Sequence, residues 1–471
     1  MSGPGLGPGR EPEAESGPGA DELVPGVEVE VEVGPVAHGG HCVARHEGRV
    51  LFVRHAIPGE RVRARITEGG PGDRFVRADA IKILRADSHR VAPPCRYAGP
   101  GGCGGCDLQH VEIGHQRTLK GQVVAEQLSR LAGVERDVVV EALDDEGGLG
   151  YRTRVELAVG TAEAPEGAAT PVLGLRRHRS HEIVPVATCA IADPRVDEGV
   201  RESHQDAVTE PEELAGLAAL DVVAAAGEAD TVVVEVPGDA DGRPLPTPPL
   251  PLTELVPAGD GRREARVDAR GFWQVHRDAP RAFVEAVLEA AAVAPGERVL
   301  DLYAGVGLLS GPLAQATGEG GQLVAVESDR RAGGHLRENL ADLPQALAVT
   351  ARVDEALGVS GRRSGRGGGR GGGGRSGGRA RRGGASSPLL PPSADVVVLD
   401  PPRSGAGREV VEALLRLRPR RVVYVACDPA ALARDTRYLR ERGAELVGLR
   451  ALDAFPMTHH VECVATFAPS P

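Results

Sequence analysis

A cysteine at the end of an apolar run is the residue of this chain best suited to nucleophilic chemistry. Residues 422–425 are β-branched or aromatic, which predicts a buried parallel strand, and Cys427 comes two residues after them, before an Asp-Pro turn. Cys427 would therefore stand at the carboxyl end of a strand, where open α/β sheets place their chemistry. A lone cysteine is more often a buried structural thiol. This one is distinguished by Asp-Pro-Pro-Arg at residues 400–403 and by the segment 455–462, which ends in Glu462.

A glycine-rich turn lies upstream, between two further predicted strands. Residues 298–303 predict a buried strand, which leads into Gly305, Gly307 and an apolar helix. Glu327 ends the next strand, 20 residues after Gly307. This is the arrangement of a nucleotide-binding βαβ unit, in which glycines admit a ligand to a helix N-terminus and the acid accepts hydrogen bonds from ribose hydroxyls. Ser310 replaces the third glycine of the dinucleotide fingerprint, whereas the loop resembles the S-adenosylmethionine (SAM) loop of class I methyltransferases.

Four further cysteines have the spacing of metal ligands. Cys95, Cys103 and Cys106 share one glycine-rich loop, and Cys189 stands 83 residues beyond Cys106. Three thiolates on one loop and a remote fourth can close a four-sulfur cage, which both zinc and an iron–sulfur cluster accept. The glycines let the backbone wrap closely around such a metal. The second cysteine pair of a zinc ribbon is missing, which favours a cluster over zinc; ordinary reduced thiols are the remaining alternative.

Several domains must position these residues, since 471 residues suffice for two or three cores. Alternating valines and glutamates after residue 26, followed by short segments with Gly/Pro turns, predict a small antiparallel barrel that either binds single-stranded RNA or serves as a docking module. The predicted parts are a disordered acidic tail (1–26), the barrel (27–85), a mixed central domain with the cysteines (90–268), and an α/β domain (270–471) with a disordered insertion (358–393).

Composition narrows the classes of function. The net charge of −12 argues against nonspecific nucleic-acid binding by the whole surface but leaves room for a local basic channel. Residues 361–382 hold 8 Arg and 11 Gly, so the insertion is either an RNA-binding segment or a tolerated loop expansion. No apolar run has the length of a signal peptide or a membrane-spanning helix. We therefore expect a cytoplasmic monomer without membrane contact.

Taken together, the motifs resemble one family: the class I, SAM-dependent RNA uracil-C5 methyltransferases, in the subset with an N-terminal TRAM domain and an iron–sulfur cluster. The resemblance covers nearly the whole chain outside the tail and the Arg/Gly insertion. Its parts are residues 34–40 (Gly-Pro-Val-Ala-His-Gly-Gly), the four cysteines, residues 272–275 (Phe-Trp-Gln-Val), the glycine loop from Asp301, residues 400–403, residues 426–429 (Ala-Cys-Asp-Pro) and residues 460–462 (His-Val-Glu).

The resemblance implies an α/β protein with a Rossmann-like C-terminal methyltransferase domain, an OB-like TRAM barrel and a mixed central domain. It also implies site residues: a [4Fe–4S] cluster on Cys95, Cys103, Cys106 and Cys189; SAM contacts from Gln274, Tyr303, Glu327 and Asp400, beside Gly305 and Gly307 of the glycine loop; Cys427 as nucleophile; and Glu462 as base.

The chain departs from the family pattern at four places. The first cysteine spacing is longer than expected, and His276, Asp428 and Met457 replace the usual Asn, Asn and His. The longer spacing between Cys95 and Cys103 weakens the resemblance at the predicted cluster. The other three departures are expected at the periphery of the site, away from the attacking groups.

The expected chemistry fits these residue types. A thiolate that adds to uracil C6 makes C5 nucleophilic toward the methyl group of SAM, and a base must then remove the C5 proton, which requires a cysteine and a nearby carboxylate. The target base must be unpaired or flipped out of its helix. The resemblance favours 23S ribosomal RNA over transfer RNA. Cytosine-C5 methylation and a non-catalytic RNA-binding protein remain as alternatives.

Overall fold

The computed structural model describes Gly19 and residues 22–143, 147–163, 169–259, 261–359 and 389–469. Most of the predicted tail (1–26) and of the predicted insertion (358–393) lies outside these residues. The chain divides into two compact units, Met1–Arg90 and Val91–Pro471. No helix among the described residues has the length and apolarity needed to cross a membrane.

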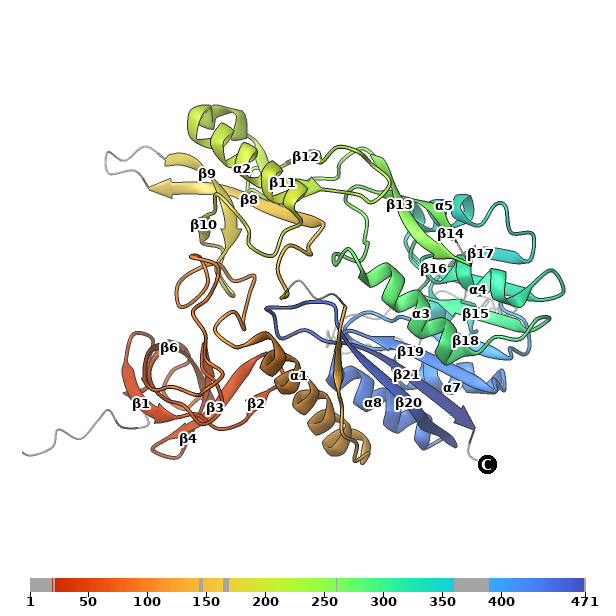
Figure 1. Ribbon diagram of the computed structural model, residues 1–471, viewed down its shortest axis with the longest axis horizontal. Helices are drawn as coiled ribbons and strands as arrows, with labels where there is room; N and C mark the ends of the chain where they lie inside the picture. Colours follow the sequence, from red (N-terminus) through yellow and green to blue (C-terminus); the bar gives the residue numbers. More distant parts are fainter. Residues whose placement is uncertain are drawn as a thin grey trace, which may run out of the picture. The chain divides into compact units, whose positions relative to one another are not determined.

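The first unit is a six-stranded barrel-like sheet in the order β1-β5-β6-β4-β3-β2 (Figure 1). Its strands are β1 (Glu28–Glu32), β2 (Val36–Ala37), β3 (His41–His46), β4 (Arg49–Arg54), β5 (Arg61–Glu68) and β6 (Phe75–Arg85). Val29 and Val31 point into the core while the glutamates between them stay exposed, as the alternation in the sequence predicts. The sheet is not purely antiparallel, because β4 and β6 run parallel. Alternation of residue types predicts the buried face of a strand but not the direction of its neighbour.

The second unit begins with the cysteine loop and a long helix and continues into a five-stranded sheet, β10-β9-β8-β11-β12. Its elements are α1 (Ile113–Gln127) with a π-helical extension (Leu128–Ala132), β8 (Arg154–Glu163), β9 (Ala169–Arg176), β10 (Ile183–Pro185), α2 (Pro194–Thr209), a 3-10 turn (Pro211–Leu214), β11 (Leu217–Val223), β12 (Val232–Pro237) and the hairpin β13 (Pro251–Ala258) and β14 (Gly261–Asp268). Asp193 caps α2 by accepting a hydrogen bond from the backbone amide of Arg195.

The C-terminal part of this unit is an eight-stranded sheet in the order β17-β16-β15-β18-β19-β21-β20-β7. Its strands are β7 (Val140–Ala142), β15 (Arg298–Leu302), β16 (Gln322–Glu327), β17 (Ala346–Thr350), β18 (Val396–Leu399), β19 (Arg421–Ala426), β20 (Ala444–Asp453) and β21 (Glu462–Pro469). The first five strands in this order are parallel, and β21 runs antiparallel to both β19 and β20.

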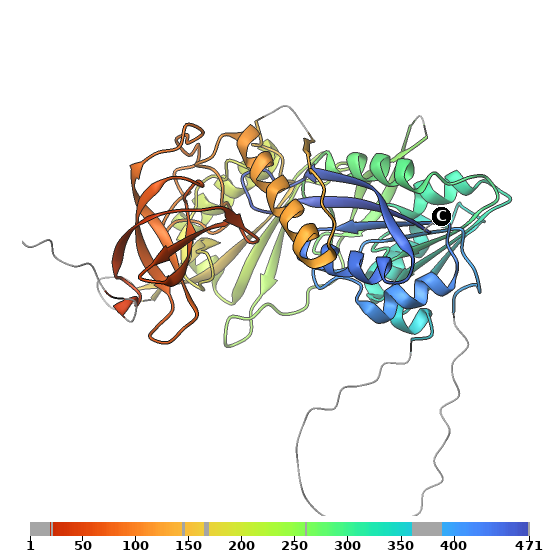
Figure 2. The same ribbon diagram turned by 90° about the horizontal axis from the view of Figure 1, so that it is seen from below.

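Helices cover both faces of this sheet (Figure 2, green on one side and blue on the other). They are α3 (Ala279–Ala291), α4 (Ser310–Thr317), α5 (Arg330–Asn339), α6 (Val353–Ala356), α7 (Arg408–Arg416) and α8 (Pro429–Arg440). Alternate residues of one strand enter different cores: Val396 and Val398 pack on one side of the sheet, Val397 and Leu399 on the other. Burial on both faces explains the continuous apolar runs of the sequence.

The predicted boundary between the central and α/β domains, near residue 269, does not separate the two parts in space. β7 comes from the predicted central domain but pairs with β20 as the last strand of the C-terminal sheet, and α1 packs against α8. A three-residue strand carries too little periodicity to be predicted, so its place in the sheet follows only from tertiary contacts.

Candidate active site

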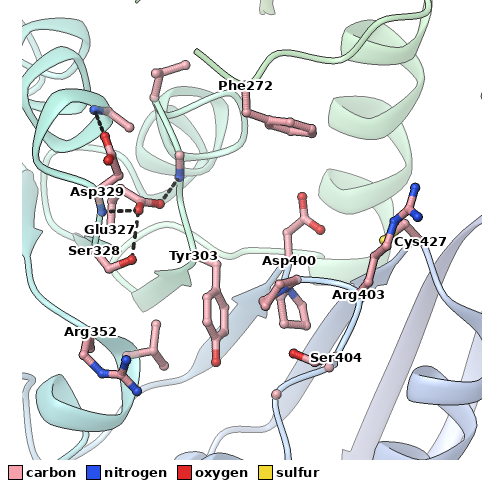
Figure 3. A pocket seen from close by; sticks show the side chains of 18 of the residues that line it. Phe272, Tyr303, Glu327, Ser328, Asp329, Arg352, Asp400, Arg403, Ser404 and Cys427 are labelled. Atoms are coloured by element: carbon pink, nitrogen blue, oxygen red, sulfur yellow. Dashed lines mark hydrogen bonds between the residues drawn. The ribbon is translucent and has the colours of Figure 1, made fainter. Parts of the chain in front are cut away.

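A cleft of about 1300 Å³ lies at the carboxyl ends of the parallel strands of the large sheet. It brings together all but one of the residues predicted for SAM binding and catalysis. These are Gln274, Tyr303, Gly305, Glu327, Asp400, Cys427 and Glu462. Figure 3 shows the side chains of Tyr303, Asp400 and Arg403 reaching into this cleft. The position of the cleft follows from the topology, because loops after parallel strands gather at one edge of the sheet.

Cys427 directly follows β19, is half-buried and lines the cleft. Burial raises the pKa of its thiol to about 11, and the charges of Glu462 and Asp400 act in the same direction. Arg403 opposes them and lowers the pKa. The next residue, Asp428, has a structural task, since its carboxylate accepts a hydrogen bond of 2.8 Å from the amide of Ala431 and caps α8.

Glu462 is the first residue of β21, the strand that runs antiparallel to β19. The register pairs Ala426 with Cys463, so that the next positions, Cys427 and Glu462, are neighbours at the strand ends. The Glu462 side chain is buried, and burial raises its pKa well above the usual value, with a further contribution from Asp400. A thiol and a carboxyl group are thus neighbours at the strand ends that line the cleft.

Two more carboxyl groups lie at the ends of β15 and β18. Burial raises the pKa of Asp400 to about 7, and the charge of Asp301 adds to the effect. Burial likewise raises the pKa of Asp301 to about 7, although its carboxylate accepts a hydrogen bond from the hydroxyl of Ser310. Ser310, the residue that replaces the third fingerprint glycine, therefore orients Asp301. In the sequence, Asp301 marks only the start of the glycine loop. In the structure its charge also raises the pKa of Asp400.

The glycine loop is shaped by positive backbone angles and by Glu327. Tyr303 and Gly305 have φ values of 65° and 56°, and the amide of Gly305 donates a hydrogen bond of 2.9 Å to Glu327. Gly307, the remaining predicted cofactor residue, does not line the cleft. A Cβ there would lie 2.8 Å from Cδ1 of Leu336, so Gly307 permits close packing of α5 on the loop.

Arg403 and His460 also line the cleft beside Cys427 and Glu462, although neither is among the predicted site residues. The Arg403 guanidinium lies 3.5 Å from Nε2 of His460. Burial, together with the charges of His459 and Arg403, lowers the pKa of His460 to about 3, which keeps the imidazole neutral. Arg403 ends the motif at residues 400–403, and His460 begins the motif at residues 460–462. Membership in these motifs is the sequence signal that could have identified both as site residues.

His276, one of the departures from the family pattern, is not among the residues that line the cleft. His276 is buried and stacks on Tyr151, with ring centroids 4.8 Å apart and an interplanar angle of 15°. Gln274, two residues earlier, faces the cleft from the same segment. The departure at Met457 lies in the turn between β20 and β21, where Met457 has a φ of 65°.

The four predicted metal ligands approach one another from two loops. The thiols of Cys95, Cys103 and Cys189 all lie close enough to Cys106 to raise its pKa, after the larger effect of burial. Within the described ranges, however, no group of three or more His, Cys, Asp or Glu side chains has the closeness that a metal site requires. The structure therefore gathers the thiols without arranging them as ligands.

Glycines allow the tight path of the cysteine loop. A Cβ at Gly102 would lie 2.1 Å from the carbonyl oxygen of Tyr97, and a Cβ at Gly104 would lie 2.5 Å from the backbone nitrogen of His178. The amide of Gly105 donates a hydrogen bond of 3.3 Å to Sγ of Cys103. Close backbone approach and amide donation to sulfur are what the glycine-rich spacing predicts.

Two family models match the chain. Residues 23–81 match the TRAM domain, and residues 392–468 match the model described as tRNA (Uracil-5-)-methyltransferase. The first match covers the barrel, and the second covers the strands and loops that carry Asp400, Cys427 and Glu462.

Full-length relatives are found in several bacteria. An uncharacterized RNA methyltransferase of Streptomyces avermitilis is 43% identical and covers 94% of this chain and 99% of its own length. The 23S rRNA (uracil(1939)-C(5))-methyltransferase of Acidithiobacillus ferrooxidans is 34% identical, with coverage of 91% and 94%. The same fold occurs in the crystal structure of Pyrococcus abyssi tRNA (uracil-54, C5)-methyltransferase with S-adenosyl-L-homocysteine, at a TM-score of 0.62, 21% identity and coverage of 93% and 99%.

Proposed function

The chain belongs to the RNA uracil-C5 methyltransferases that carry a TRAM domain, and on that premise we propose that it methylates a uracil of 23S ribosomal RNA through a covalent bond between Cys427 and C6 of the base. The observation that carries the proposal is the pairing of Cys427 with Glu462 inside the cleft of a SAM-dependent fold. Neither residue alone implies this chemistry, but a thiol and a base side by side match the addition to C6 and the removal of the C5 proton.

In the proposed first step the Cys427 thiolate adds to C6 of the uracil, and the electron pair of the C5–C6 bond moves toward O4. SAM supplies an electrophilic methyl group: C5 forms its new bond to the methyl carbon as the bond from that carbon to the sulfonium sulfur breaks, which leaves S-adenosyl-L-homocysteine. Glu462 accepts the remaining C5 proton. The C5–C6 double bond re-forms as the bond between Cys427 and C6 breaks, which returns the thiolate.

The electrostatics of the site suit these roles. Arg403 is the cation that lowers the Cys427 pKa, so it favours the thiolate that must attack. The raised pKa of Glu462 makes its carboxylate a stronger proton acceptor than an exposed glutamate. Burial therefore strengthens Glu462 as a base, whereas at Cys427 the charge of Arg403 offsets part of the rise in pKa that burial causes.

The SAM site is proposed along the wall opposite Cys427. Gln274, Tyr303 and Gly305 line both the cleft and a smaller adjoining cavity of about 60 Å³. The Glu327 carboxylate is proposed to accept hydrogen bonds from ribose hydroxyls. The pKa of Asp400 is raised to about 7, and the positive charge of bound SAM would favour the ionised form of this carboxyl group.

The four thiols of Cys95, Cys103, Cys106 and Cys189 are proposed to hold a [4Fe–4S] cluster, with zinc as the lesser alternative. The proposal is supported by the convergence of four half-buried thiols and by the amide that donates to Cys103. Bound metal would supply a covalent tie between the cysteine loop and the segment that carries Cys189.

The outer face of the barrel offers a stacking surface for an unpaired RNA base. Phe75 is 43% exposed, and its ring lies 5.2 Å from that of Phe52 in an edge-to-face arrangement. The Arg77 guanidinium lies 5.8 Å from the Phe52 ring and 5.5 Å from the Phe75 ring and is paired with Glu68. Aromatic rings beside a guanidinium plane are the surfaces on which single-stranded bases stack. The barrel is therefore proposed to bind an unpaired segment of the RNA that contains the uracil to be methylated.

Methyl transfer from labelled SAM to purified, unmodified 23S rRNA and tRNA tests the function, with nucleoside analysis of the product. We expect 5-methyluridine in 23S rRNA and no transfer by Cys427→Ala. Label confined to tRNA would establish the tRNA alternative, and 5-methylcytidine would move the reaction to cytosine. Full transfer by Cys427→Ala would refute the covalent mechanism.

A further inference from the structure

The turn between β20 and β21 delivers Glu462 into the cleft, and it is held by a segment more than three hundred residues earlier in the chain. The carbonyl oxygen of Met457 accepts two hydrogen bonds of 2.9 Å, from the backbone amides of Asp107 and Leu108. These amides directly follow Cys106. The cysteine loop and the catalytic turn are thus joined through the backbone.

Gln116, in the first turn of α1, contacts the backbone amide of Met457. Its side chain is fully buried, and its Oε1 accepts a hydrogen bond of 2.9 Å from the amide of Met457. Its amide nitrogen donates to the carbonyl oxygens of Leu108 and Val111 at 3.0 Å and 2.9 Å and lies 3.2 Å from Sδ of Met457. One amide side chain therefore ties the turn to the segment that precedes α1.

Met457 needs this support because its backbone is strained. Its φ is +65°, a conformation that is unfavourable for a non-glycine residue and persists only where the surrounding contacts enforce it. Met457 is 6% exposed, and its amide, carbonyl oxygen and sulfur all contact residues 107–116. The contacts with residues 107–116 therefore hold Met457 in its strained backbone conformation.

Residues just beyond and within this segment, Lys120 and Asp107, hold the two ends of the turn. Lys120 Nζ lies 2.5 Å from Oδ1 of Asp453, where β20 ends, and donates a hydrogen bond of 3.0 Å to the carbonyl oxygen of Phe455. At the other end, Nδ1 of His459 lies 2.6 Å from Oδ2 of Asp107. The ring of His459 lies against that of His460, with centroids 4.1 Å apart. The contacts thus continue to within two residues of Glu462.

Within the described part of the chain, the hydrogen bonds of Gln116 go to residues 108, 111 and 457, whereas Cys427 is positioned by β19 and by the start of α8. A change at Gln116 should therefore disturb the base more than the nucleophile.

We propose that Gln116 is a positioning residue for the proton-abstraction step, because it fixes the strained Met457 turn from which Glu462 enters the cleft. The inference rests on the proposed roles of Cys427 and Glu462. A displaced base leaves attack and methyl transfer intact but slows release of the enzyme from the methylated base. The covalent complex between Cys427 and RNA then accumulates.

The test measures single-turnover methylation and SDS-stable RNA–protein complex for Gln116→Ala, with Thr118→Ala as the control on an exposed position of the same helix. We expect product release to slow about 100-fold, the effect of a displacement near 1 Å, with the covalent complex accumulating and SAM affinity within about twofold of wild type. Turnover and complex levels equal to those of Thr118→Ala would overturn the proposal. Slower turnover without the complex would overturn it as well.

A second variant covers the case in which Gln116→Ala does not fold. Gln116→Glu keeps an acceptor for the amide of Met457 but loses the donor to the carbonyl oxygens of Leu108 and Val111, and we expect the same accumulation to a smaller extent. Turnover and complex levels equal to wild type in a folded Gln116→Glu would then decide against the proposal. Cys427→Ala separates the two hypotheses: an active Cys427→Ala enzyme refutes the covalent mechanism itself, independently of Gln116.

Discussion

The hydroxyl of Tyr424 donates a hydrogen bond of 2.8 Å to Oδ2 of Asp435, and both side chains are buried beneath the loop that follows Asp400. The same carboxylate oxygen accepts the amides of Ala406 and Gly407, at 2.8 Å and 3.1 Å. One buried oxygen thus fixes the path of a loop that includes Arg403 and closes one side of the cleft.

Replacement of Asp435 should therefore affect both folding and the site. In Asp435→Asn the carboxamide can turn a donor toward amides that need an acceptor, so we expect a loss of about 1–3 kcal/mol in the free energy of unfolding. Turnover should fall as the loop loosens around Arg403. Denaturant unfolding and methylation rates measure the two effects. Tyr424→Phe removes a single donor and should have the smaller effect on both; equal unfolding midpoints for Asp435→Asn and wild type would contradict the prediction.

The reactivity of Cys427 should rise steeply with pH. Its pKa is raised to about 11, and only the thiolate attacks, so the rate of alkylation should increase about tenfold per pH unit below that value. Iodoacetamide labelling, followed by mass spectrometry of the Cys427 peptide, measures this rate.

Two variants should shift that pH profile in opposite directions. The charge of Glu462 raises the Cys427 pKa, so Glu462→Gln should move the profile to lower pH. The charge of Arg403 lowers the pKa, so Arg403→Gln should move it to higher pH. Shifts of the same sign in both variants would show that these charges do not act on the thiol as described.

The stacking surface on the barrel predicts a local RNA contact. Phe75→Ala should weaken binding of unpaired RNA by about 1–3 kcal/mol, the usual contribution of one base stacked on an aromatic ring. Fluorescence anisotropy with labelled substrate RNA measures the affinity. Leu84→Ala, on the same strand and 37% exposed, is the matched control. If both variants bind like wild type, this face of the barrel does not contact the RNA.

The four-thiol site predicts a metal-dependent colour and a metal-dependent activity. Cys103→Ser should lose the iron absorption of anaerobically purified enzyme, whereas Cys42→Ala, in the barrel core, should keep it. Turnover should fall as well, because Cys106 directly precedes the amides that hold Met457. Absorption spectra and metal analysis check the prediction. A colourless wild-type enzyme with bound zinc would reject the cluster and keep the metal site.

The sequence by itself predicted the local features of the catalytic domain. Apolar runs that end in Cys427 or in the glycine loop define strands and the turns after them, because periodicity and turn residues act over a few positions. The position of Cys427 at a strand end follows from this local information. The roles of Cys427 and Glu462 came from motif resemblance, and the arrangement of the four cysteines as metal ligands stays a prediction.

Only the tertiary structure decided which segments meet. The antiparallel register of β21 on β19 makes Glu462 the neighbour of Cys427, and the contact between Gln116 and Met457 joins residues 341 positions apart. Patterns in a sequence show which face of an element is buried but not which partner covers it, since the partner is selected by packing of the whole sheet. For the same reason the strained turn at Met457 left no signal in the sequence: its φ is stabilised by hydrogen bonds from distant residues and not by its own residue type.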